Sequence, residues 1–204
     1  MGEFLDNENS PVWIDNNHFD GGKEGVTFIG AGSPMSPISV TNNHSTNQTR
    51  KGLQIYHGER HSVINNRFEN ITAESGFNND SGVIWLDELS YEDDQRNIVA
   101  DNVIHDCYGN GLFLEEYRGL IINDEIRRMK ERRNDVYSVN YTYTTPDETV
   151  EAIVTSMGGN GILVSGGCHD LTIQGNRITE CEKSAIMFNR AIGVHTGVEI
   201  RNVF

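Results

Sequence analysis

Residues 102–119 read NVIHDCYGNGLFLEEYRG, and this stretch decides the fold. Its polar side chains include His105, Asp106, Cys107, Glu115 and Glu116, and such a set could form a compact catalytic or metal site. The stretch also has two halves, an Asn-bounded apolar half and a half in which Gly precedes alternating apolar residues. Both halves recur along the chain, so the polar residues have to be judged as parts of a repeat.

The first half recurs seven times. The copies are IDNNHF from Ile14, VTNNHS from Val40, VINNRF from Val63, VADNVI from Val99, IINDEI from Ile121, IQGNRI from Ile173 and IRNVF from Ile200. Their spacings are 26, 23, 36, 22, 52 and 27 residues. The shorter spacings cluster, and the two long ones indicate a coil of ordinary length that carries an insertion.

The second half is a small residue followed by alternating apolar positions. Its copies are GVTF from Gly25, GLQI from Gly52, GVIW from Gly82, GLFL from Gly111, GILV from Gly161 and SAIM from Ser184. Alternation predicts strands, and the Asn and Gly clusters between them predict turns. Strands this short cannot bury a face alone, so we expect successive coils to stack on one another.

These two halves resemble the repeats of right-handed parallel β-helix proteins of the pectate-lyase-like superfamily. The resemblance covers nearly the whole chain and implies an all-β solenoid of about six to seven coils. We expect one β-helix domain over residues 1–204, with an insertion at 127–157 inside one coil. The resemblance identifies an architecture well and a function poorly.

The phase of the repeat predicts which side chains point inward. The expected core ladders contain Val26 and Phe28, Leu53 and Ile55, Val83 and Trp85, Leu112 and Leu114, Ile162 and Val164, and Ala185 or Ile186 with Phe188. A polar ladder at the turns is expected from Asn17, Asn43, Asn66, Asn102, Asp124 and Asn176. Cys107 and Cys181 share a phase with Ile71 and Met129, which indicates core positions. Cys168 is expected to be exposed in a Gly turn.

Composition limits the partners of the chain. The formal net charge of −14 argues against nucleic acid and against anionic membranes, because both need a basic face. No apolar run reaches transmembrane length, and the first ten residues do not form a signal peptide. The resemblance nevertheless implies an extracellular or cell-surface protein. Three cysteines without a CxxC spacing do not support a disulfide framework or a zinc site.

The insertion is expected to be a helix followed by a hairpin. DEIRRMKERRND, residues 124–135, favours a short surface helix, and YSVNYTYTT and TVEAIVTS favour two strands around the turn PDET. The insertion either walls a groove or only covers its coil. A separate acidic run, Glu92 to Asp94, is either a solvated loop or a calcium site, since calcium prefers several converging oxygens.

Candidate chemistry is sought by column, because a solenoid brings equivalent positions of neighbouring coils to about 5 Å. Counting two residues past each predicted core pair aligns His57, Asp87 and Glu116. Carboxylates about 5 Å apart match a retaining glycosidase, so Asp87 and Glu116 are the candidate catalytic pair, with His57 to tune them or contact substrate. A second column contains Glu69, His105 and Arg127, beside Asp106 and Arg128. The alternative is that both columns are ordinary polar decoration.

The flanking side chains are candidates for substrate binding: Tyr56, Glu88, Glu115, Tyr117 and Arg118. In the polysaccharide lyases of the resembled superfamily, the proton beside a uronate is abstracted by an arrangement that uses either calcium or a base with an arginine. By that analogy Arg118 with His57 or His105 would do so, while Asp87 and Glu116 hold Ca²⁺. No other cofactor and no dedicated metal site is expected.

Two classes of function remain open. The first is a glycoside hydrolase or polysaccharide lyase acting on an extracellular polysaccharide. The second is a non-catalytic surface or glycan-binding solenoid, such as an adhesin or a tail-fibre segment. The last copy stops within its first strand at VEIRNVF, and this predicts either a longer protein or end-to-end association of copies.

Overall fold

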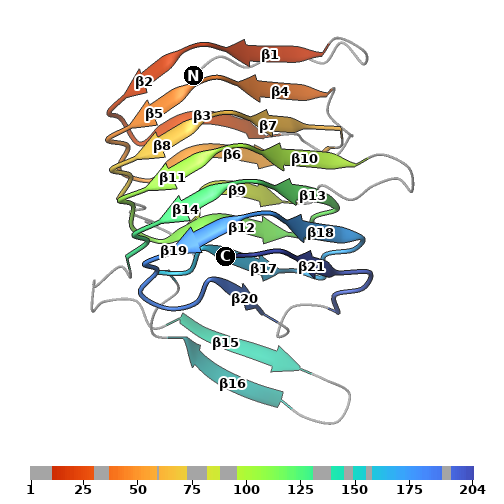
Figure 1. Cartoon of the computed structure of the whole chain (residues 1–204). Coiled ribbons are helices and arrows are strands. Elements are labelled where there is room, and N and C mark those ends of the chain that lie inside the picture. Colours follow the sequence, from red (N-terminus) through yellow and green to blue (C-terminus); the bar gives the residue numbers. More distant parts are fainter. Residues whose placement is uncertain are drawn as a thin grey trace.

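The computed structural model describes residues 11–29, 37–58, 60–72, 82–87, 96–130, 139–144, 149–154, 158–189 and 194–204. Three parallel sheets run along the molecule, and each coil contributes one strand to each sheet (Figure 1). The chain is therefore a right-handed parallel β-helix, as the repeat predicts. Within the described residues every element is a strand, so none is a helix able to cross a membrane.

The strands of each sheet follow one another in space. Sheet 1 contains β1 (Val12–Asp15), β4 (Ile38–Thr41), β7 (Ser62–Ile64), β10 (Asn97–Ala100), β13 (Gly119–Ile122), β18 (Leu171–Gln174) and β21 (Glu199–Arg201). Sheet 2 contains β2 (His18–Asp20), β5 (His44–Thr46), β8 (Arg67–Glu69), β11 (Val103–His105), β14 (Glu125–Arg127) and β19 (Arg177–Thr179). Sheet 3 contains β3 (Glu24–Ile29), β6 (Lys51–Tyr56), β9 (Gly82–Asp87), β12 (Asn110–Glu115), β17 (Ile162–Ser165) and β20 (Ile186–Phe188).

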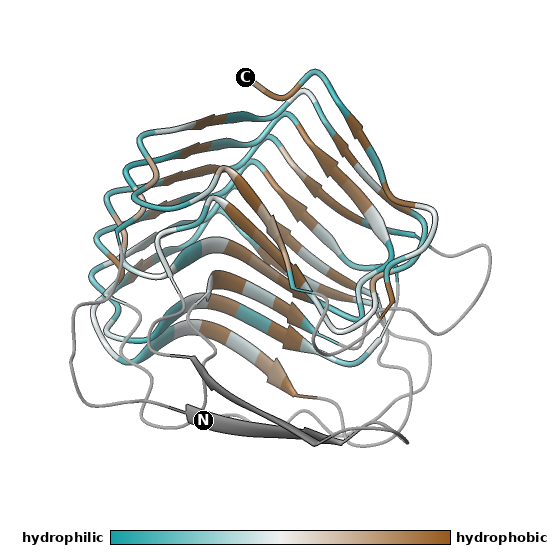
Figure 2. Ribbon diagram, turned by 90° about the horizontal axis from the view of Figure 1, so that it is seen from below, coloured by the Kyte–Doolittle hydropathy of each residue, from teal (hydrophilic) through white to brown (hydrophobic). Residues whose placement is uncertain are grey.

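The core is a set of apolar ladders enclosed by the three sheets. Apolar strand segments recur at the same place in successive coils (Figure 2). The predicted pairs of β6, β12 and β17 are almost fully buried, and those of β3 and β20 pack against them. In β20 the pair is Ile186 and Phe188. The core is continuous because each rung stacks on like residues in the coils above and below.

The pair predicted for β9 is wrong by one residue. Ile84 pairs with Leu53 and Leu112, so Ile84 and Leu86 form the ladder in place of Val83 and Trp85. Gly82 pairs with Asn110, which puts Val83 where the next coil has Gly111. Val83 is buried, but Trp85 is only half-buried and faces outward. Four consecutive apolar residues conceal the phase of this strand, and a slip of one residue exchanges its two faces.

The polar ladder forms as predicted at the turn between sheets 1 and 2. Both the main-chain N and Nδ2 of Asn43 donate to Oδ1 of Asn66, at 2.9 and 3.0 Å, and Asn66 does the same to Asn102. The residue before each rung has a positive φ, for example 55° at Asn65. Asn tolerates this left-handed conformation, which explains the recurrent Asn pairs in the sequence.

The predicted hairpin of the insertion is confirmed, and the predicted helix is not. An antiparallel hairpin forms from β15 (Val139–Thr144) and β16 (Thr149–Val154). The predicted helix is wrong over 124–130, where Glu125–Arg127 is strand β14 and Ile126 is a buried core rung between Ile104 and Ile178. Stacking on two neighbouring strands outweighs the local helical pattern. The rest of that segment lies outside the described residues.

Candidate functional site

The outer face of sheet 3 carries two rows of side chains. Since Ile84 and Leu86 point inward, their neighbours Trp85 and Asp87 point outward. Trp85 is the Cα partner of Gln54 and Phe113, and Asp87 is the partner of Tyr56 and Glu115. The same register continues to β17 with Leu163 and Ser165. We call this surface the sheet-3 face; its site residues are Lys51, Gln54, Tyr56, Trp85, Asp87, Asn110, Phe113, Glu115 and Ser165.

The predicted line of His57, Asp87 and Glu116 does not form. Asp87 ends its strand beside Glu115, whereas His57 and Glu116 lie one residue past the strand ends, with φ of 67° and 48°. The register of β9 explains the difference. It places Asp87 beside Tyr56 and Glu115, one residue before His57 and Glu116. Asp87 and Glu115 are therefore the two carboxylates on neighbouring strands of one face, about 4.8 Å apart at Cα. Glu88 lies outside the described residues.

Aromatic rings stand beside these carboxylates. The rings of Trp85 and Phe113 meet edge to face, with centroids 6.1 Å apart. The ammonium of Lys51 lies 3.3 Å from the centroid of Trp85 and donates to Gln54 Oε1 at 3.1 Å. Such a cation–π contact holds the indole in place. Lys51, absent from the sequence-based candidates, is fully buried although it lies on the outer face.

Several buried donors on the sheet-3 face lack a hydrogen-bond partner. They are Trp85 Nε1, Asn110 Nδ2 and Ser165 Oγ. Asn160 Nδ2 donates to Asn110 Oδ1 at 2.9 Å and fixes the Asn110 amide. The Nδ2 of Asn110 takes no part in that bond. A buried donor without a partner costs stability, and folded proteins keep few of them.

The remaining predicted binding residues have different environments. Tyr56 is half-buried and its ring contacts that of His57, with centroids 4.0 Å apart. Tyr117 is wrong as a surface residue, because its side chain is fully buried in the core. Its main-chain N donates to Cys168 Sγ at 3.3 Å, and the turn after β12 directs the ring inward. Arg118 pairs with Asp170, Nη2 to Oδ2, at 2.8 Å.

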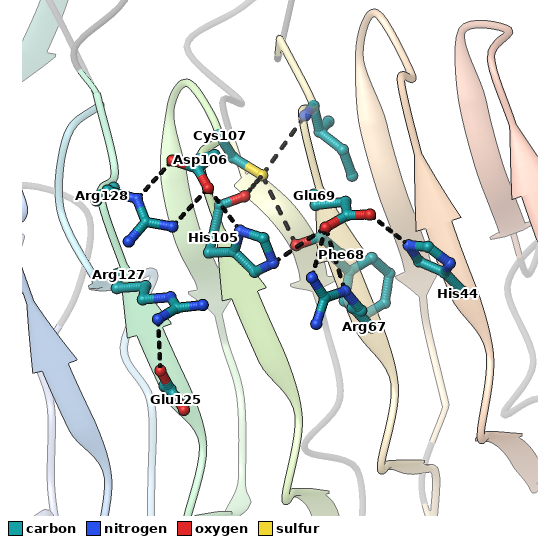
Figure 3. Close-up of polar contacts among 11 residues, drawn as sticks. His44, Arg67, Phe68, Glu69, His105, Asp106, Cys107, Glu125, Arg127 and Arg128 are labelled. Carbon is teal, nitrogen blue, oxygen red and sulfur yellow. Dashed lines mark hydrogen bonds and ion pairs between the residues drawn. The ribbon is translucent and has the colours of Figure 1, made fainter.

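The second predicted column does form, on the outer face of sheet 2 (Figure 3). Glu69, His105 and Arg127 are Cα partners on β8, β11 and β14. Glu69 accepts from His44 Nε2 at 2.8 Å and from Arg67 Nη2 at 2.8 Å. Burial alone would raise the pKa of Glu69, but the hydrogen bonds from Arg67 and His44 outweigh it and the pKa is lowered.

The His105–Asp106 pair closes this network. His105 Nδ1 lies 2.7 Å from Asp106 Oδ2, and two bonds from Arg128 to Asp106 hold the pKa of that carboxyl well below its usual range. His105 Nε2 is 3.1 Å from Glu69 Oε2, an ion-pair distance whose angle does not make a hydrogen bond. His105 is 6% exposed and faces carboxylates at both nitrogens. The network therefore bonds successive coils together.

Cys107 and Cys168 are core residues, and Cys181 is half-buried against the core. Cys107 is buried as predicted, and Cys168, predicted to be exposed, is buried as well. Positive φ at Gly166 and Gly167 turns Cys168 inward, where its thiol donates to the Ser165 carbonyl at 3.2 Å. Burial is the main cause that raises the pKa of each thiol to about 12. The predicted calcium loop at 92–94 lies outside the described residues.

Comparison with known proteins adds two family matches. The model of the right-handed β-helix region matches residues 2–132, and the model of NosD, a periplasmic copper-binding protein, matches residues 89–196. No curated protein matches the chain. Among solved structures, the catalytic domain of a GH87 α-1,3-glucanase in complex with tetrasaccharides aligns with a TM-score of 0.42 and 14% identity. The alignment covers 90% of this chain and 40% of that one.

The description of the NosD family names copper, and the donors among the described residues of this chain do not fit such a site. All seven His and three Cys lie in described segments, where no three His, Cys, Asp or Glu side chains are grouped for a metal. Cys107 and Cys168 hold their protons in the core. His61 Nδ1 and His195 Nδ1 accept from backbone N–H groups and so are occupied.

We expect copper titration to show no stoichiometric site. Cu(I) and Cu(II), each competed against a chromophoric chelator, should stay with the chelator, because thiolate and imidazole donors do not converge here. Spectroscopy of the desalted protein provides a second measurement. One equivalent of retained copper that is lost in Cys107→Ser would contradict this expectation.

Proposed function

Because the chain belongs to the right-handed β-helix family, we propose that it is a carbohydrate-active β-helix protein whose sheet-3 face binds a glycan. Aromatic rings beside carboxylates suit sugars, which present apolar ring faces and hydroxyl groups. The observation that carries the proposal is the register that pairs Asp87 with Glu115 next to the Trp85–Phe113 pair.

Hydrolysis is the reaction that this register supports best. Retaining glycosidases use two carboxyl groups about 5 to 5.5 Å apart, one as acid and base and the other as nucleophile. Asp87 and Glu115 lie on adjacent strands at about that separation at Cα. The lyase arrangement has less support, because Arg118 is engaged by Asp170 at the far side of the turn.

Glycan binding without turnover is the second candidate, and one observation favours it. Asp87 is only 7% exposed, so a substrate reaches it less readily than Glu115, Tyr56 or Trp85, which are half-buried. For either function we propose a location outside the cytoplasm. The periplasmic description of the NosD family supports that location.

A glycan panel tests the proposal. Wild-type protein is incubated with neutral and uronate-containing polysaccharides, and reducing ends, unsaturated ends and retention in affinity electrophoresis are measured. We expect retention on at least one glycan, lost in Trp85→Ala and kept in Trp13→Ala, since Trp13 is 71% exposed on sheet 1. Retention by neither wild type nor variants, or equal loss in both variants, would refute a glycan site on the sheet-3 face.

A further inference from the structure

The polar ladder has one rung that differs in charge. In the three middle Asn rungs, Asn43, Asn66 and Asn102, Nδ2 donates both to Oδ1 of the next rung and to a strand carbonyl of the preceding coil. Asn66 Nδ2, for example, lies 3.0 Å from Asn102 Oδ1 and 2.8 Å from the Val40 carbonyl. Each of these Nδ2 atoms therefore lies near at least these two acceptors, and an amide nitrogen can donate to both with its two hydrogens.

Asp124 occupies the fifth position of this ladder. Its Oδ1 accepts from the main-chain N and Nδ2 of Asn102, at 2.8 and 2.9 Å, and its own N donates to Asn176 Oδ1 at 2.7 Å. Its Oδ2 stands where the other rungs have Nδ2, is buried, and has no hydrogen-bond partner. By equivalence with Asn66 and Asn102, this oxygen faces Asn176 Oδ1 and the Val99 carbonyl, which are both acceptors.

A carboxylate in this place would present a third acceptor to two others. A carboxylic acid would donate its Oδ2–H to one of them and complete the rung as far as a single proton can. Asn176 cannot turn its amide to help, because its Nδ2 already donates to the Ile121 carbonyl at 2.9 Å.

We propose that Asp124 carries a proton in the folded protein and acts as a pH-sensitive rung, so that ionisation of this one side chain loosens the coil between β13 and β14. β13 begins three residues after Glu116, and β14 precedes the segment that leads to the β15–β16 hairpin. The stability of this region therefore depends on the pH of the surroundings, independently of any glycan.

The groups around Asp124 agree with this assignment. Burial, the largest cause, raises the pKa of Asp124 to about 7; the hydrogen bonds from Asn102 oppose it, and the charge of Asp101 adds to it. Tyr117 is the other titratable group affected: burial, then the charges of Asp124 and Cys168, raise its pKa well above the usual value. Its Oη is buried and makes no hydrogen bond to Asp124 in this structure.

The sign of the pH dependence follows from the raised pKa. Below the unfolded value of 3.8 both states hold the proton, and the contribution of Asp124 to stability is full. Between 3.8 and about 7 the unfolded chain loses the proton while the folded chain keeps it, so stability falls as pH rises. Above about 7 both states are ionised and the loss is complete.

The test compares Asp124→Asn with wild type by urea unfolding across this pH range. The amide restores the missing donor, so at neutral pH the variant's unfolding equilibrium constant should be roughly a hundredfold to a thousandfold smaller than that of wild type. The gain should shrink towards acid pH. Asp101→Asn is the matched control, because it makes the same change at an exposed position. It should change the unfolding equilibrium constant by less than about threefold.

A second measurement observes the proton directly. The infrared spectrum of the wild type at mildly acidic pH should contain a protonated carboxyl band that disappears in Asp124→Asn and persists in Asp101→Asn. Burial lowers the pKa of His61 to about 4, so His61 also contributes to the pH dependence of unfolding. For this reason only the difference between variant and wild type is interpreted. A variant less stable than wild type at neutral pH, or a gain independent of pH, would overturn the proposal.

Discussion

Replacing Asp87 by Asn or Glu115 by Gln should reduce hydrolysis of a responsive glycan about a thousandfold, with the fold unchanged. Each substitution removes a carboxyl group that must transfer a proton or attack the sugar, and such groups contribute on the order of 10²- to 10⁴-fold. Both side chains lie at strand ends on the outer face, so neither change opens the core. Steady-state release of reducing ends, with urea unfolding of each variant, measures the two effects.

The controls come from the adjacent turn positions. Glu116→Gln and His57→Gln alter the residues that the sequence alone placed in line with Asp87, and both should retain activity within a few-fold. The φ of Glu116 is 48° and its N donates to the Ser165 carbonyl at 3.3 Å, so it continues the turn instead of the strand. Inactive Glu116→Gln together with active Glu115→Gln would reverse the assignment. Glycan retention by the wild type without any release of reducing ends would favour the binding function.

Replacing Gly119 by Ala should destabilise the protein by about 4 kcal/mol or more, which is enough to unfold many domains. A Cβ built on Gly119 would lie 2.1 Å from the Asn97 carbonyl oxygen and 2.9 Å from its nitrogen. These are backbone atoms of the paired strand and cannot move without breaking the sheet. The φ of +150° at Gly119 adds strain for any side chain.

Gly22 is the matched control for this substitution. Its φ of +82° is also in the left-handed region, but a Cβ there would meet no atom within 4 Å. Gly22→Ala should therefore show only the conformational cost, about 1 kcal/mol. Urea unfolding followed by tryptophan fluorescence compares the two. Equal losses in both variants would mean that the contact with Asn97 does not matter.

Much of the fold follows from the sequence because the repeat appears in it many times. The Asn rungs, the buried phase of Cys107, the Glu69–His105–Arg127 column and the hairpin are each predicted from local pattern and found in the structure. Each depends on residues whose chemistry permits one place in a coil. An Asn next to a left-handed turn is one such residue, and a Cys that alternates with Ile and Met is another.

The candidate site depends on the register of β9, which the local sequence pattern does not reveal. In β9 four successive residues are apolar, so the alternation that reveals the inward face is absent, and Gly82 pairs with Asn110 instead of Gly111. Positive φ at Glu116 and at Gly166 and Gly167 precedes Tyr117 and Cys168, and the sequence does not reveal that these turns direct the two side chains inward.

The sequence by itself determined that this chain is a stack of similar coils with a polar ladder at one turn, because every coil repeats the same chemical demand. Only the tertiary structure decided which carboxylates share a face and that one ladder position lacks a donor. Those facts depend on what lies one coil away, about 4.8 Å in space but 22 or more residues along the chain.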